Sequence, residues 1–364
     1  MVKRVLPVFA SVLALVLAAS AVVAADGERP GFDLQTELDS FAQAGPGGAV
    51  ALTLRDGLTT TAAAGETSVN GAPMTIDTPM WIGSLTKTFI AAMTLQLVEE
   101  GKVELDAPLS TYLPEMHVGG DVAVRDLLAQ RSGLGDFPEP FEAIVADPSR
   151  TWTPADLFAT VDGTEPGGLP GIHSYANINY ALLGQLIEAV DERDIQASFQ
   201  ERIAGPLDLK ATKFAYGDTP PPQGLASGWL PGLGQNGDPD AEIEAMASSA
   251  YTMGGLTSTA PEIATFLTAL AAGDIISDDS LEQMFDTGDA GYGFGVMTDE
   301  YALGDLGSDV TYYGHGGAHP LGFRSFAAAD PQTGDLFVVL TNSFDAIPEE
   351  FSMDIIRAWA QTDS

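Results

Sequence analysis

Ser84 and Lys87 are separated by two residues, the spacing at which side chains on a helix become neighbours. An apolar run over residues 88–98 predicts a buried helix that ends near Gly101. Ser84 therefore falls at the N-terminal end of this helix. Unpaired N–H groups and the helix dipole at that end favour negative charge on the oxygen of a carbonyl under attack.

A buried lysine can serve as the base for a serine nucleophile. Burial disfavours the ammonium form, so Lys87 would carry a neutral amine that accepts the Ser84 proton. The alternative is that Ser84 only caps the helix and Lys87 is a first-turn surface residue. Lysine occurs only five times in the chain, and a positive charge at this terminus opposes the dipole. We therefore interpret the pair as nucleophile and base.

Tyr175 and Asn177 form a second cluster, between the glycine-rich loop 167–171 and a patterned helix over 180–190. In an extended backbone, side chains two residues apart point the same way, so both would face one cleft. A phenol there can relay the proton of the leaving group, and an amide can hold a substrate carbonyl. The alternative is that Asn177 or Asn179 caps the helix.

Residues 312–318 predict a strand that leads into a glycine-lined position at Gly316 and Gly317. An extended substrate can lie against such an edge, where a strand N–H would join that of Ser84 in an oxyanion hole. His315 would add a polar or cationic group beside the serine. The alternative is a glycine loop that carries a solvated histidine.

In this order the three clusters, S-x-x-K, Y-x-N and H-x-G, resemble the serine β-lactamase and D-alanyl-D-alanine carboxypeptidase family, on the branch of class C β-lactamases and related esterases. The similarity covers nearly the whole mature chain and is also carried by residues 82–89, 97–106, 126–134 and 254–259. It implies an α+β, β-lactamase/DD-peptidase-like fold: an antiparallel sheet flanked by helices, with a mostly helical inserted subdomain.

The resemblance also implies roles in the site. Ser84 would be acylated, Lys87 and Tyr175 would share proton transfer, and Asn177 would bind the substrate amide. His315, Gly316 and Gly317 would line the substrate, and the backbone N–H groups of Ser84 and Ala318 would form the oxyanion hole. No metal or organic cofactor belongs to this chemistry.

These features lead us to expect an acyl-serine hydrolase similar to D-alanyl-D-alanine carboxypeptidases. A small peptide, ester or β-lactam would be the substrate, and cell-wall peptidoglycan is a candidate partner. An esterase, a class C-type β-lactamase and a non-catalytic wall-binding module are the alternatives. Two departures from the pattern of the peptidases leave substrates without a free carboxylate as candidates. Gly316 and Ala318 stand where peptidases often have hydroxyl residues that hold the terminal carboxylate, and residues 297–313 contain no arginine. Arg324 is a candidate replacement for the missing arginine, but the strand pattern does not determine toward which face of the sheet its side chain points.

The elements around the clusters come from both ends of the chain. Alternating segments predict one hairpin around Asp56-Gly57 and another around residues 330–334, and a helix starts near Pro348. The segments between these ends are helical in pattern, with candidate helices at 124–130, 154–161, 180–190 and 196–203. We therefore divide the mature domain, residues 26–364, into an α/β part (26–105 and 246–364) and a helical insertion (106–245), with the site in the cleft between them.

Residues 1–25 have the pattern of a secretory signal, with Lys3 and Arg4, an apolar run over 5–23 and small residues before Asp26. Cleavage there predicts a secreted protein, extracellular or periplasmic, without stable membrane insertion. The alternative is an uncleaved anchor, because the apolar run is nearly long enough to span a bilayer.

The chain is strongly acidic, with 51 Asp and Glu residues against 15 Lys and Arg residues. This balance makes nucleic acid an implausible partner. It fits either a protein kept soluble in salty surroundings or an ordinary solubilising surface. The absence of cysteine excludes disulfides, thiolate metal sites and a cysteine nucleophile. His117, His173 and His319 are interpreted as structural, since their spacing forms no metal site.

Overall fold

The centre of the fold is a six-stranded antiparallel sheet in the order β2-β1-β11-β10-β9-β8. The computed structural model describes residues 32–43, 45–119, 121–137, 143, 146–161, 167–230, 235–298 and 311–360. All of the described helices and strands lie in the unit Leu34–Ser364. The predicted signal segment, residues 1–25, lies outside the described residues.

Both predicted hairpins are confirmed. β1 (Gly48–Arg55) turns at Asp56-Gly57 into β2 (Leu58–Gly65), and both turn residues have positive φ, as a type I′ turn requires. β10 (Phe323–Ala329) and β11 (Leu336–Thr341) form the second hairpin. β11 pairs with β1, with Ala49 opposite Thr341, so two strands that are far apart in the sequence lie side by side in the middle of the sheet.

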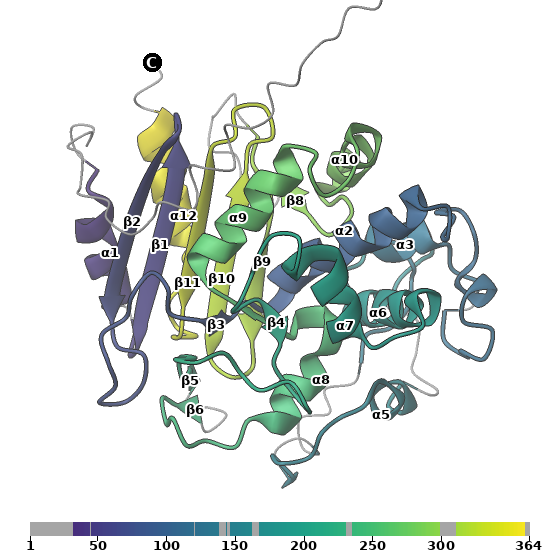
Figure 1. Ribbon diagram of the computed structural model, residues 1–364, viewed down its shortest axis with the longest axis horizontal. Helices are drawn as coiled ribbons and strands as arrows, with labels where there is room; N and C mark the ends of the chain where they lie inside the picture. Colours follow the sequence, from purple (N-terminus) through teal and green to yellow (C-terminus); the bar gives the residue numbers. More distant parts are fainter. Residues whose placement is uncertain are drawn as a thin grey trace, which may run out of the picture. The chain divides into compact units, whose positions relative to one another are not determined.

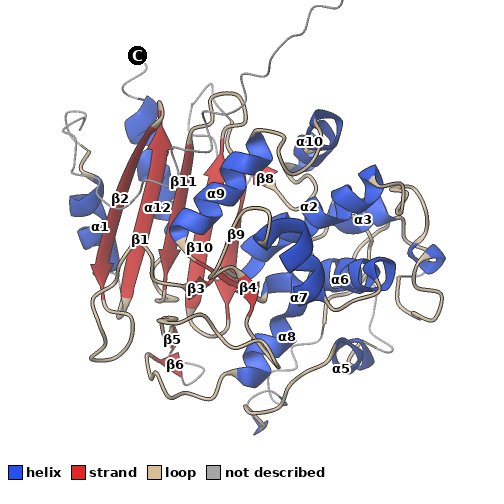
Figure 2. Cartoon of the chain, viewed as in Figure 1, coloured by secondary structure: helices blue, strands red, loops and turns tan. Residues whose placement is uncertain are grey.

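Helices cover both faces of this sheet (Figures 1 and 2). α9 (Ala260–Ala271) crosses one face and α12 (Pro348–Ala360) lies on the other, where Phe351 of α12 packs 5.2 Å from Phe41 of α1 (Leu34–Ala42). Every residue of β11 is buried, which explains its continuous apolar run. The α+β fold expected from the sequence is therefore confirmed.

The helix that follows Ser84 is the most buried helix in the described structure. A 3₁₀ turn, η1 (Gly83–Leu85), leads directly into α2 (Thr86–Glu99), and the chain leaves the helix at Gly101 with φ +69°. Phe89 of α2 stacks on Phe266 of α9, with ring centroids 3.7 Å apart. Because α2 is buried on nearly all sides, it has no solvent face on which Lys87 could lie.

The remaining elements lie mainly in segment 106–245 and after it. The four helices predicted in this segment are present. They are α3 (Val124–Leu128, predicted at 124–130), α5 (Pro154–Ala159, predicted at 154–161) and α6 (Asn177–Asp191, predicted at 180–190). The fourth, predicted at 196–203, consists of α7 (Ile195–Phe199) followed by the π-helical η3 (Gln200–Ala204). The segment also contains η2 (Leu109–Thr111) and the two-residue strands β4 (Lys213–Phe214), β5 (Trp229–Leu230) and β6 (Gln235–Asn236). The boundaries of the insertion at 106 and 245 stay predictions.

Seven further elements complete the described fold. β3 (Met80–Trp81) pairs with β7 (Leu256–Ser258), which also pairs with β4. Elsewhere lie α8 (Glu244–Gly254), α10 (Asp278–Phe285), η5 (Gly288–Ala290), β8 (Met297–Thr298) and β9 (Tyr313–His319). Within the described ranges, no helix is long and apolar enough to cross a membrane.

Arg202 of η3 joins the C-terminal ends of α2 and α6. Its guanidinium donates to both carboxylate oxygens of Asp191, each at 2.6 Å, and to both of Glu100, at 2.7 and 3.2 Å. The side chains of Arg202 and Asp191 are only 10% and 5% exposed, and this pairing lowers the pKa of the Asp191 carboxyl. The ion pairs therefore fix two helices whose opposite ends carry the predicted site.

We expect Arg202→Ala to lower the free energy of unfolding by about 2 kcal/mol, because it leaves the buried Asp191 carboxylate without its main partner. Arg193→Ala, which removes an exposed ion pair with Glu201, is the control and should change stability by less than about 0.5 kcal/mol. Urea denaturation measures both. Equal effects of the two variants would contradict this account.

Candidate active site

Lys87 is fully buried, and its amine meets three oxygen atoms from three different elements. Nζ lies 2.9 Å from Ser84 Oγ on η1, 2.9 Å from Asn177 Oδ1 on α6 and 2.6 Å from the Met253 carbonyl oxygen at the end of α8. Ser84 itself is partly exposed. The predicted nucleophile and base are therefore in hydrogen-bond contact, with the nucleophile on the accessible side.

Burial lowers the pKa of Lys87 from 10.5 to about 7, and the negative charge of Asp136 opposes this shift. A neutral amine has two N–H groups and one lone pair. The Asn177 and Met253 oxygens can accept both N–H groups, which leaves the lone pair directed at the Ser84 hydroxyl. In this state Ser84 donates to Nζ, the geometry required for general-base activation of the serine.

Tyr175 and Asn177 both face Lys87, as the sequence predicts. The Lys87 ammonium position lies 5.0 Å from the centre of the Tyr175 ring. The alternative that an asparagine caps the helix is wrong, because the N-cap of α6 is Ala176, which has no side-chain group that could accept a capping hydrogen bond. Asn179 instead contacts Ser132 and Gln130 in the interior.

Asp136 is a site residue that sequence reasoning missed. Its carboxylate accepts hydrogen bonds from Asn177 Nδ2 at 3.0 Å and from the Ile178 backbone N–H at 3.1 Å, at the positive end of α6. The first contact fixes the Asn177 amide with its oxygen toward Lys87. A single aspartate in a loop gives no spacing signal, although it lies two residues after the stretch 126–134 used for the resemblance.

The predicted strand at residues 312–318 is β9, and its glycines allow it to lie against the serine turn. A Cβ added to Gly317 would lie 2.0 Å from the Ile82 carbonyl oxygen, and one added to Gly83 would lie 2.7 Å from the Ala318 nitrogen. The backbones of the serine turn and β9 are thus in direct contact. This places the Ala318 N–H beside Ser84, where an oxyanion hole requires a donor.

Gly316 faces the other side of the strand. A Cβ at this position would lie 3.0 Å from Glu349 Oε1 on α12. Arg324 of β10 shares that face: its guanidinium lies 3.6 Å from Glu349 Oε2 and 5.5 Å from the centre of the Phe344 ring. Its neighbour Ser325 points the opposite way and donates to the Ile82 carbonyl. Arg324 therefore points away from the serine and cannot hold a substrate carboxylate there.

His315 is buried and neutral. Burial, together with the nearby charge of Lys87, lowers its pKa to about 3. Its Nδ1 hydrogen bonds to the Gly316 carbonyl, so Nε2 is the nitrogen that accepts a hydrogen bond from the Tyr292 hydroxyl, at 3.0 Å. Of the two roles expected for His315, the polar one fits the geometry and the cationic one does not.

The three histidines interpreted as structural make no described contact with Lys87. His319 is buried against Trp81, with ring centroids 4.9 Å apart, and burial lowers its pKa to about 3. His173 packs 5.3 Å from the Tyr292 ring, and His117 is exposed.

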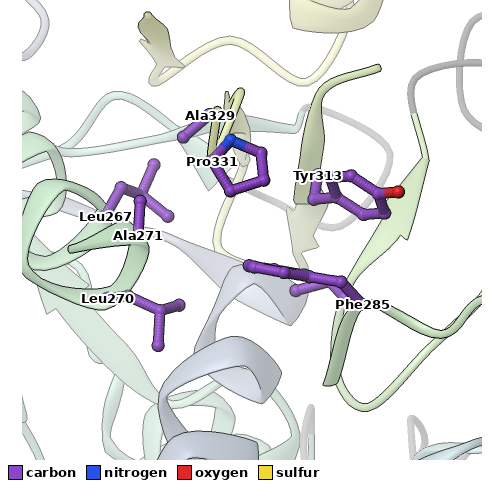
Figure 3. Close-up of a pocket in the computed structure, with 8 residues that line it drawn as sticks. Leu267, Leu270, Ala271, Phe285, Tyr313, Ala329 and Pro331 are labelled. Carbon is purple, nitrogen blue, oxygen red and sulfur yellow. The ribbon is translucent and has the colours of Figure 1, made fainter. Parts of the chain in front are cut away.

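An apolar cavity of about 10 Å³ lies apart from these residues (Figure 3). Leu270 and Phe285 contribute side chains to it from α9 and α10, and Tyr313 does so from β9. It is too small for an organic substrate, and none of the lining residues belongs to the Ser84 cluster.

The sequence matches the family model described as Beta-lactamase over residues 23–360. The chain belongs to the beta-lactamase family. This membership, with the contact between Ser84 and Lys87, makes it a serine hydrolase of that fold. The recognition made from the sequence motifs is therefore confirmed.

The chain also resembles individual proteins. The chain is similar to D-amino acid amidase from Ochrobactrum anthropi SV3, with 28% identity, a TM-score of 0.76, and coverage of 91% of this chain and 98% of that one. It is 35% identical to D-aminopeptidase of Brucella anthropi over 47% of this chain and 33% of the relative. It is 28% identical to the putative penicillin-binding protein PbpX of Bacillus subtilis over 62% of this chain and 55% of the relative. The chain thus spans about half or less of these two curated relatives.

We expect kcat/KM to rise with pH through a single acidic limb near pH 7, because Lys87 must lose its proton before it can accept that of Ser84. His315 should add no limb near its ordinary value, since it stays neutral above about pH 3. Rates measured between about pH 5 and 11 test this. A limb near pH 10, the ordinary range of lysine, would show that Lys87 is not the depressed base.

Gly317→Ala and Gly316→Ala form a matched pair on opposite faces of β9. The first should reduce kcat/KM more than about 100-fold, because it separates Ala318 from the serine turn and disturbs the oxyanion hole. The second meets only the end of the Glu349 side chain and a ring edge, so its loss should be less than about tenfold. Steady-state kinetics decide, and similar losses in both would refute the close-approach argument.

Proposed function

We propose that this protein hydrolyses amides and short peptides of D-amino acids that carry a free amino group, through an acyl-enzyme on Ser84. The observation that carries the proposal is the 2.9 Å contact between Ser84 Oγ and a buried Lys87 amine whose pKa is lowered to about 7. The likeness to a D-amino acid amidase and a D-aminopeptidase supports the substrate class.

The reaction follows from the positions of the side chains. Ser84 Oγ gives its proton to Lys87 Nζ and bonds to the amide carbon, and the oxyanion takes hydrogen bonds from the N–H groups of Ser84 and Ala318. Lys87, assisted by the Tyr175 hydroxyl, returns a proton to the leaving nitrogen as the C–N bond breaks. Water then attacks the ester, its proton passes to the same groups, and Ser84 is regenerated.

The charges around the site favour an ammonium over a carboxylate on the substrate. His315 is neutral and Arg324 is engaged on the far face of the sheet, so neither supplies a cation to the site. Asp136 is exposed and lies directly behind Asn177, the side chain assigned to the substrate amide. A carboxylate in this place attracts the free amine of an aminoacyl substrate and repels a terminal carboxylate.

Carboxypeptidase activity with penicillin binding is the second candidate, supported by the likeness to PbpX. Intact-mass spectrometry after brief exposure to a penicillin, beside Ser84→Ala, separates the candidates. A persistent adduct of one drug mass that is absent in the variant would favour the penicillin-binding candidate. Consumption of the drug without an adduct would indicate a β-lactamase.

We expect D-phenylalanine amide to be cleaved in preference to both its L-enantiomer and N-acetyl-D-phenylalanine amide. Asp136→Asn should raise KM for the free-amine substrate about tenfold, the loss expected for one charge-assisted hydrogen bond. The acetylated substrate is the internal control, because a loss caused only by movement of Asn177 would affect both substrates equally. Faster hydrolysis of acetyl-D-alanyl-D-alanine than of the amides would favour the carboxypeptidase.

We also propose that the protein acts outside the cytoplasm. The proposal is supported by the signal-like pattern of residues 1–25. N-terminal sequencing of the protein recovered from the medium or periplasm should start at Asp26. Recovery of the intact N-terminus in a membrane fraction would support the anchor instead.

A further inference from the structure

Tyr251 has an unusual backbone conformation inside α8, with φ 37° and ψ −136°. Six non-glycine residues of the described structure have positive φ, and the other five are the polar residues Asp56, Asn70, Gln130, Glu192 and Asp208. A bulky aromatic residue rarely adopts positive φ, and its strain persists only where the surroundings enforce it.

The side chain of Tyr251 shows what enforces the strain. Its hydroxyl donates to Glu188 Oε2 at 2.7 Å and accepts from Gln185 Nε2 at 3.0 Å, both on α6. A Cβ added to Gly184 of the same helix would lie 2.8 Å from the Tyr251 ring, so the ring packs directly on the α6 backbone. With 2% of its surface exposed, Tyr251 is anchored to the helix that carries Asn177.

The strained residue directs the chain toward the catalytic lysine. Two residues after Tyr251, the Met253 carbonyl accepts a 2.6 Å hydrogen bond from Lys87 Nζ. Between them, Thr252 Oγ1 donates to the Tyr180 carbonyl of α6 at 2.8 Å. The Gly255 N–H donates to the Tyr251 carbonyl at 2.8 Å and closes the turn. The carbonyl that receives the lysine is thus held by contacts at both ends of a short, tight segment.

We propose that Tyr251 is a positioning residue, which uses its anchor on α6 to hold the Met253 carbonyl against Lys87 and so directs the lysine lone pair at Ser84. This inference rests on the proposed function only for the role of Lys87 as base. Without a fixed carbonyl, one N–H of the neutral amine would be free to turn toward Ser84 Oγ, and the lone pair would point elsewhere. The strain at Tyr251 thereby contributes to the alignment of nucleophile and base.

The other groups that face Lys87 are not contacted by the Tyr251 hydroxyl in any described hydrogen bond. The rings of Tyr175 and Tyr180 lie 5.0 and 5.8 Å from Nζ, and the His315 imidazole is neutral. Asp136 supplies the negative charge that opposes the lowering of the Lys87 pKa. These groups remain in a Tyr251→Phe variant. A change in the titration of Lys87 would therefore reflect a change in its hydrogen bond to the Met253 carbonyl.

The test uses NMR of protein labelled with ¹³C at lysine Cε, which needs no substrate. The chain has only five lysines, so the Lys87 signal can be assigned with Lys87→Met. The wild-type amine should titrate near pH 7. In Tyr251→Phe this value should fall by about half a unit to one unit, since a hydrogen bond to the ammonium form is weakened. The plateau of kcat/KM should fall about tenfold.

Tyr112→Phe is the matched control, because it removes a tyrosine hydroxyl that accepts a 2.7 Å hydrogen bond from the Glu104 N–H in another part of the fold. It should leave the Lys87 titration unchanged. Glu188→Gln, which weakens the anchor and retains its shape, should shift Lys87 in the same direction by less and serves if Tyr251→Phe does not fold. An unchanged Lys87 titration in the folded anchor variant would overturn the inference. A wild-type value near 10 would overturn the proposed base and the inference with it.

Discussion

The burial of one amine is the constraint on which the rest of the site depends. A lysine amine with no access to water must find oxygen partners inside the protein, because an unpaired buried polar group costs several kcal/mol, on the order of 2–7. Lys87 finds them on the serine turn, on α6 and at the end of α8. These three elements must therefore meet at one point, and the meeting point is the active site.

The sheet supports this arrangement through its contacts with Ile82. β9 lies against Ile82 because Gly317 has no side chain, and the Ser325 hydroxyl of the next strand donates to the same Ile82 carbonyl at 2.7 Å. A hydrogen bond from the sheet thus holds the backbone two residues before the nucleophile. The position of Ser84 is in this way set by the rigid layer of the fold, and that of its base by the helices.

The parts of the site that sequence reasoning predicted are those with a fixed local spacing. The spacing of Ser84 and Lys87 brings side chains together on a helix, and the spacing of Tyr175 and Asn177 does so in an extended segment. The sequence could therefore predict that the side chains of each pair lie on the same side. The first hairpin could also be predicted, because Asp56-Gly57 is a dipeptide typical of a type I′ turn. Met253 contributes a carbonyl, which every residue has, and Asp136 acts through a contact that depends on how distant loops pack. Neither leaves a pattern in the sequence, and the direction of Arg324 depended in the same way on which face of the sheet α12 covers.

The pairing of β1 with β11 also determines the order in which this protein can fold. Ala49 pairs with Thr341, so the middle of the sheet closes only after the chain has been made as far as β11. Loop-closure entropy makes such distant pairings slow to form. The serine turn rests on β9, which belongs to the same late-arriving strands. A nascent chain with all of its catalytic side chains up to Asn177 therefore lacks the surface that organises them. We therefore expect hydrolytic competence to arise only after β9, β10 and β11 have joined the sheet.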